Sequence, residues 1–104
     1  MFYAGLVIHC KDAGQWNTLL KMLEDSGYIW CTGRKVFEER GVDYNPDCHS
    51  FICIHNSAHA EWPPKSFFMR GLNDIGDKDM ALYNNPIEFE DFLSPVPMEV
   101  GDLI

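Results

Sequence analysis

The fold is decided by residues 12–27, DAGQWNTLLKMLEDSG, which have the pattern of one helix enclosed by its start and stop signals. Asp12 is a favoured N-cap residue, and Gly27 is a favoured residue just past a helix C-terminus. Between them the apolar side chains recur at i, i+3, i+4 and i+7, the spacing of one helical face: Trp16, Leu19, Leu20 and Leu23. We therefore predict one main amphipathic helix over Ala13 to Ser26.

The rest of the chain is typical of short strands separated by turns. Apolar and β-branched residues indicate strands at Tyr3–Cys10, Tyr28–Cys31 and Ser50–His55. Ser66–Met69 and Met80–Tyr83 are shorter candidate strands that could pair as a hairpin across the polar residues between them. A short helical turn is expected within residues 35–40.

A second helix is predicted near the C-terminus. Asn84-Asn85-Pro86 is a turn and helix-start signal, and it precedes an expected helix over Ile87–Leu93 with positions 89, 92 and 93 inward. The predicted fold class is α+β: a small antiparallel sheet covered by the main helix, with the short C-terminal helix packed at an edge of the sheet or on the same face as the main helix. We expect one domain over residues 1–94 and an acidic, proline-containing tail over residues 95–104.

The composition describes an acidic globular chain. Its 104 residues carry a formal net charge of −8, and 46% of them are hydrophobic. Residues 53–104 hold nine acidic and three basic side chains. This balance repels nucleic-acid phosphates and anionic lipid, and it favours basic protein surfaces. No apolar run is long enough to span a bilayer and no signal peptide is visible, so we expect a cytoplasmic protein with four reduced cysteines.

The acidic second half provides the leading hypothesis for a binding surface. The residues expected to contact a basic partner are Asp74, Asp77, Asp79, Glu88, Glu90 and Asp91, with Trp62, Phe67 and Phe68 as buried anchors of that interface. The alternative interpretation is that these acidic residues contact no partner and only keep a small domain soluble.

A ligand-binding alternative involves the turn after the second predicted strand. Arg34 and Lys35 are adjacent cations, and Tyr28 and Trp30 lie just before them. Stacking and ion pairing could let an oligomer of the chain hold a nucleotide-like anion there. A solvated turn with core aromatics behind it would have the same sequence.

Enzymatic and metal-site patterns are weak. The chain has no nucleophile elbow, P-loop or glycine-rich dinucleotide motif, so we expect neither catalytic residues nor a cofactor. His9 cannot serve as a direct base for Cys10 if both lie in one strand, because adjacent residues point to opposite faces. A zinc-stabilised domain is a third alternative, with Cys48, Cys53, His55 and His59 as the candidate ligands; ordinary packing of the same residues is the competing interpretation.

Two segments resemble a pattern in small proteins of tailed bacteriophages. These are Val7-Ile8-His9-Cys10 before the helix and Gly27-Tyr28-Ile29-Trp30-Cys31-Thr32-Gly33 after it. The second segment matches this pattern more specifically than the first, whereas residues 56–80 and the tail depart from it. Many phage proteins of this size modulate host machinery or block bacterial immunity, including CRISPR nucleases and nucleotide signalling.

The resemblance implies an accessory protein that binds and inhibits a host or defence protein in the bacterial cytoplasm. An anti-CRISPR-like inhibitor with an acidic surface is therefore our leading hypothesis, and sequestration of a nucleotide-like signal by an oligomer is the alternative. No catalytic residue is carried over from the resemblance.

Overall fold

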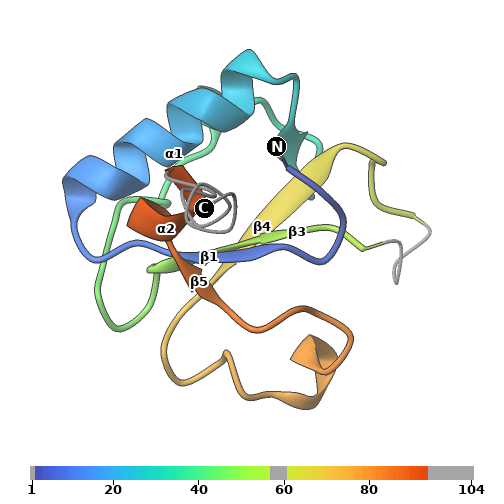
Figure 1. The fold of residues 1–104 in the computed structure, drawn as a ribbon. Helices are drawn as coiled ribbons and strands as arrows, with labels where there is room; N and C mark the ends of the chain where they lie inside the picture. The colour runs from blue at the N-terminus through green and yellow to red at the C-terminus, as the bar shows by residue number, and fades with distance from the viewer. Residues whose placement is uncertain (1, 57–60, 94–104) are drawn as a thin grey trace, which may run out of the picture.

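Five short strands form one mixed sheet in the order β2-β4-β3-β1-β5. The computed structural model describes residues 2–56 and 61–93 (Figure 1). The strands are β1 (Val7–His9), β2 (Ile29–Trp30), β3 (Phe51–Ile54), β4 (Ser66–Arg70) and β5 (Ile87–Glu88). Two α-helices accompany them in these residues, α1 (Ala13–Asp25) and α2 (Phe89–Leu93). The α+β class is confirmed, and no helix of the described ranges is both long and apolar enough to cross a membrane.

The strand directions correct the expectation of an antiparallel sheet. β3 pairs antiparallel with both β1 and β4, but β5 lies parallel to β1 and β2 lies parallel to β4. The shared direction of β1 and β2, which are not paired with each other, follows from their connection, because a helix between two strands returns the chain to the end of the sheet where it started. α1 makes this return between β1 and β2. Four strands therefore run in one direction and β3 alone runs in the other.

Helix α1 covers one face of the sheet, as its sequence pattern predicts. The Asp12 carboxylate accepts a hydrogen bond from the Gln15 backbone N–H at 2.8 Å, which satisfies one free donor of the first turn. Gly27 ends the helix with a φ of 83°, a conformation that a Cβ atom disfavours and that glycine adopts readily. The buried residues of the helix are Trp16, Leu19, Leu20 and Leu23. They pack with Ile8, Ile52 and Phe67 of the sheet in the larger hydrophobic cluster.

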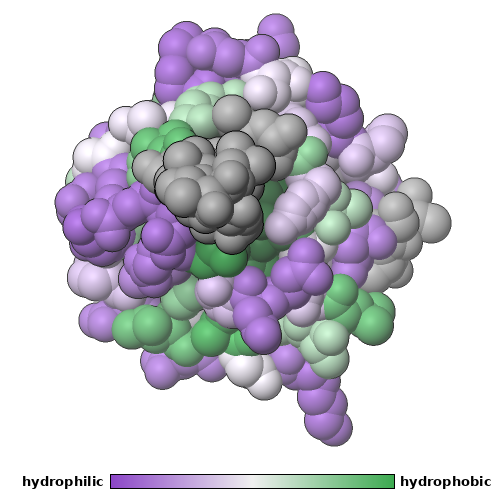
Figure 2. All heavy atoms as spheres, in the orientation of Figure 1, coloured by the Kyte–Doolittle hydropathy of each residue, from purple (hydrophilic) through white to green (hydrophobic). Residues whose placement is uncertain are grey.

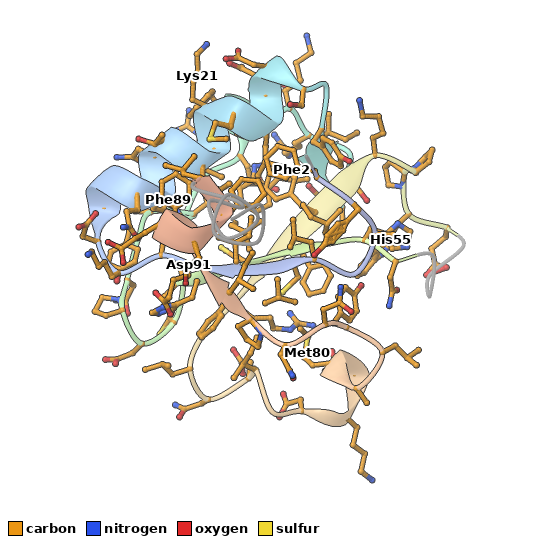
Figure 3. The ribbon with its side chains drawn as sticks, in the orientation of Figure 1. Phe2, Lys21, His55, Met80, Phe89 and Asp91 are labelled. Atoms are coloured by element: carbon orange, nitrogen blue, oxygen red, sulfur yellow. The ribbon has the colours of Figure 1, made fainter. Side chains whose placement is uncertain are left out.

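The segment 71–86 covers the opposite face of the sheet (Figure 1). Met80 packs there with Val7 and Cys53 in a second cluster, and Figure 3 shows it on the far side of the sheet from Phe2 and Phe89. The predicted strand Met80–Tyr83 and its hairpin with Ser66–Met69 are wrong. Lys78–Met80 is a 3₁₀ helix followed by turns, because the chain must cross the sheet face here rather than extend the sheet.

The C-terminal helix is shorter than predicted. Ile87 and Glu88 pair with β1 as β5, so helical geometry begins only at Phe89. Phe89 is buried, whereas Leu93 is 48% exposed and does not point inward. Phe92 is half-buried and stacks on Phe2, with ring centroids 5.3 Å apart. The predicted tail, residues 95–104, lies outside the described residues.

Candidate functional site

All six acidic residues of the predicted partner-binding surface are exposed. They are Asp74, Asp77, Asp79, Glu88, Glu90 and Asp91. The stretch 71–93 that carries them holds only one basic residue, Lys78. In this stretch the covering segment 71–86 packs on one face of the sheet, β5 is an edge strand, and α2 packs on the face that α1 covers.

Three of these acids contact nitrogen atoms of side chains in the sheet or at its margins. Asp79 accepts a hydrogen bond from Arg70 of β4 at 2.7 Å, and Glu90 accepts one from Lys11 at 2.8 Å. Both carboxylate oxygens of Glu88 lie 3.0 Å from Nδ1 of His9 on β1. These pairs tie the acidic stretch to the sheet, and each contributes little stability at an exposed position.

The other three acidic side chains make fewer contacts with the described residues. Asp74 accepts a hydrogen bond from the Gly71 N–H at 3.2 Å, which fixes a local turn. Asp77 and Asp91 make no ion pair with any residue of 2–56 or 61–93. Asp77 and Asp91 are therefore the acidic side chains of this surface most available to a partner.

The aromatic residues predicted as interface anchors are part of the protein's own core. Phe67 is fully buried under α1, where its ring lies 4.3 Å from that of Trp30. Phe68 points to the opposite face and is buried beneath Tyr83 and the half-buried Trp62. This placement corrects the expectation, because alternation along β4 assigns each Phe to one of the two cores. Neither ring is presented to a partner of the folded protein.

Two leucines that the sequence analysis did not single out are the exposed apolar residues of the covering segment. Leu72 is 53% exposed and Leu82 is 74% exposed. In Figure 2, apolar and hydrophilic surfaces adjoin over the lower part of the view, where Figure 1 places the segment. Leu72 had a sequence signal for exposure, as a lone leucine in a turn-rich stretch, whereas Leu82 lay in the predicted strand Met80–Tyr83 and had none.

The four residues of the predicted ligand site do not surround one cavity. Tyr28 and Lys35 line a shallow cleft of about 190 Å³ beside the end of α1. Trp30 is 3% exposed and forms part of another cleft, of about 350 Å³, at the carboxyl end of β2. The exposed Arg34 lies 3.6 Å from the Glu39 carboxylate. The predicted combination of all four residues around one ligand is therefore not assembled.

The candidate metal ligands are spread over the sheet and its loops. Cys53 is fully buried in the second cluster, Cys48 is exposed in the loop before β3, and His55 is buried near Trp62. His59 lies outside the described residues. Within residues 2–56 and 61–93, no three histidine, cysteine or acidic side chains are grouped as a metal site.

The buried thiols are poorly suited to nucleophilic chemistry. Burial raises the pKa of Cys10 to about 12, and the nearby Asp12 and Glu88 carboxylates add to this increase. Burial likewise raises the pKa of Cys53 to about 12. Cys10 lies in the core under α1 while His9 stacks on Phe51 at the opposite face, as the strand alternation predicts. Both buried thiols therefore remain protonated at neutral pH.

Comparison with known proteins gives no match. The chain matches no protein-family model, and no curated protein or solved structure is significantly similar to it.

Proposed function

We propose that the protein is a binding module that docks its acidic stretch, residues 71–93, against a basic surface of a partner protein. The observation that carries the proposal is the combination of exposed acids and exposed leucines on the covering segment 71–86. Protein interfaces commonly pair an apolar contact with complementary charge at its rim. Leu72 and Leu82 would supply the apolar contact in place of Phe67 and Phe68.

The covering segment is held in a defined shape, which favours binding. Successive turns are closed by backbone hydrogen bonds from Asp74, Asp77, Met80 and Tyr83 to the residue three positions earlier, at 2.9–3.1 Å. Its two ends are fixed by Leu72 N–H to Asp47 O at 3.0 Å and Asn84 N–H to Gly5 O at 2.9 Å. A pre-ordered surface loses less conformational entropy when a partner binds.

The resemblance to small phage proteins extends the proposal to the identity of the partner. A host or bacterial-immunity protein with a basic, nucleic-acid-binding surface is the class that an acidic inhibitor would block, because the acids would occupy the place of phosphates. The CRISPR nucleases are one such class. This part of the proposal rests on the resemblance of residues 7–10 and 27–33 alone.

The test is affinity capture from a bacterial lysate with three matched baits. One is the native protein, the second carries Asp77→Lys with Asp91→Lys, and the control carries Asp25→Lys with Asp43→Lys, which changes the net charge equally at exposed sites elsewhere. We expect the native and control baits to retain the same stoichiometric partner and the second bait to lose it. Native mass spectrometry of the eluate gives the stoichiometry. A partner retained equally by all three baits, or by none, contradicts the proposal.

A further inference from the structure

The larger cleft lies where the chain leaves the sheet edge after β2. It has a volume of about 350 Å³, within the range of small-molecule sites. Its apolar wall is formed by Trp30 of β2, Phe68 and Met69 of β4, and Val42 from the loop after the 3₁₀ turn. Such a wall accommodates a flat apolar or aromatic body.

Two of the three arginines of the chain lie in or next to this cleft. Arg40 lines it directly, and Arg34 forms an ion pair with Glu39, another residue of the lining. The third, Arg70, lies over the Phe68 ring, with its guanidinium carbon 4.7 Å from the ring centroid, and donates a hydrogen bond to Asp79 of the covering segment at 2.7 Å. A chain with a net charge of −8 thus has two guanidinium groups at this cleft.

The carboxylate that lines the cleft, Glu39, already has hydrogen-bond donors, whereas the arginine that lines it, Arg40, has no ion pair within the described residues. Glu39 accepts hydrogen bonds from the Thr32 hydroxyl at 2.9 Å and from the Arg40 backbone N–H at 3.3 Å, besides its contact with Arg34. The exposed Arg40 guanidinium has no ion pair with any residue that the structure describes. Arg40 is therefore the charged group of the cleft that is available to an anionic ligand.

We propose that this cleft binds a small aromatic anion, with the aromatic body against Trp30 and Met69 and the anionic group on Arg40. A guanidinium binds carboxylate and phosphate oxygens through paired, charge-assisted hydrogen bonds. The chain's overall negative charge does not prevent this, because salt screens exposed charges beyond about 8 Å at physiological ionic strength. The cleft does not involve the acidic stretch 71–93, so the two proposals can fail separately.

The test is a titration of the native protein with two probe anions and their neutral counterparts. Indole-3-acetate presents a carboxylate and adenosine monophosphate presents a phosphate, while indole-3-acetamide and adenosine present the same rings without the charge. Binding is followed by two-dimensional NMR. The reporters are the Trp30 indole N–H, which donates to the Val36 carbonyl at 2.9 Å, and the Met69 methyl group, with the Met22 methyl group on α1 as the reference.

We expect at least one anion to shift the Trp30 and Met69 signals saturably, and the carboxylate or phosphate that does so identifies the class of anionic group. The Arg40→Gln variant should weaken this binding by about tenfold or more, since one charge-assisted hydrogen-bond pair is lost. Lys21→Gln removes an equal charge from the exposed face of α1 and should leave the affinity unchanged. No saturable shift with either anion, or equal affinity for anion and neutral counterpart, would overturn the proposal.

The Cys31 thiol gives an independent readout because it also lines the cleft. It is half-buried, whereas Cys48 is exposed on a separate loop. A bound anion should slow alkylation of Cys31 by iodoacetamide at saturation and leave the rate at Cys48 unchanged. Equal alkylation of Cys31 with and without a saturating probe anion would place that anion elsewhere and overturn the assignment.

Discussion

At the scale of single residues, Gly71 has the closest backbone neighbours among the glycines of the described residues, at the point where β4 ends and the covering segment begins. A Cβ added there would meet the backbone of Asp47 and lie within 2.8 Å of the Cys48 carbonyl oxygen. We therefore expect Gly71→Ala to reduce the free energy of unfolding by about 1–3 kcal/mol, the usual cost of overpacking a closed site. Urea unfolding followed by tryptophan fluorescence measures the change.

Gly76 in the same segment is the matched control. A Cβ at Gly76 would meet no atom within 4 Å, and its φ is not in the positive range. Gly76→Ala should be neutral or stabilising by up to about 1 kcal/mol, because alanine restricts the unfolded chain. If both substitutions have the same effect, the close approach of Gly71 to the loop before β3 does not hold this end of the segment.

At the scale of elements, helix α1 depends on a reciprocal cap. Asp12 accepts from the Gln15 N–H, and the Gln15 side chain accepts from the Lys11 N–H at 2.9 Å. Asp12→Ala should destabilise the protein by about 1 kcal/mol, which lowers the melting temperature by roughly 4–8 °C in a domain of this size. Thermal unfolding followed by circular dichroism at the helical band tests this value.

The conservative substitution Asp12→Asn distinguishes the effect of the capping hydrogen bond from the effect of the negative charge. Asp12→Asn keeps a side-chain oxygen that can accept from Gln15, so it should retain most of the stability that Asp12→Ala loses. Equal losses in both variants would assign the effect to the negative charge near the helix N-terminus instead.

Helix α1 was readable from the sequence because its signals are local. The apolar spacing, the Asp12 cap and the Gly27 stop all lie within residues 12–27. The β5 strand could not be predicted from the sequence. Ile87 and Glu88 adopt an extended conformation through pairing with Ile8 and His9, which lie nearly eighty positions earlier. Parallel pairing between β2 and β4 is equally non-local, and no pattern within either strand specifies its partner.

Some features of the candidate surfaces could be predicted from the sequence and others could not. The exposure of the six acids follows from their charge alone, so their positions could be predicted from composition. The roles of Phe67 and Phe68 could not, because a strand covered on both faces buries both alternating sets. The cleft beside β2 escaped prediction because residues from β2, β4 and the 39–42 loop form it together.

At the scale of the whole molecule, the two buried thiols couple stability to alkaline pH. Burial raises the pKa of Cys10 and Cys53 from 9.0 to about 12. Above about pH 9 the unfolded chain releases these protons while the native protein keeps them, so the unfolded state binds fewer protons. The free energy of unfolding should therefore fall as the pH rises from about 9 towards 12, by up to about 1.4 kcal/mol per pH unit for each thiol.

Other groups titrate in the same window, so the prediction is a difference between variants. Burial raises the pKa of Tyr83 and of Cys31 as well, and both contribute to the decline in every variant. Cys10→Ala combined with Cys53→Ala should flatten the fall in stability between about pH 8 and pH 10.5, even if the variant is less stable throughout. Cys48→Ala, at an exposed thiol, should keep the native slope. Denaturant unfolding with a reductant present measures the slope of unfolding free energy against pH for the native protein and both variants. If the double variant has the same slope as Cys48→Ala, the two core thiols ionise as readily in the native protein as in the unfolded chain.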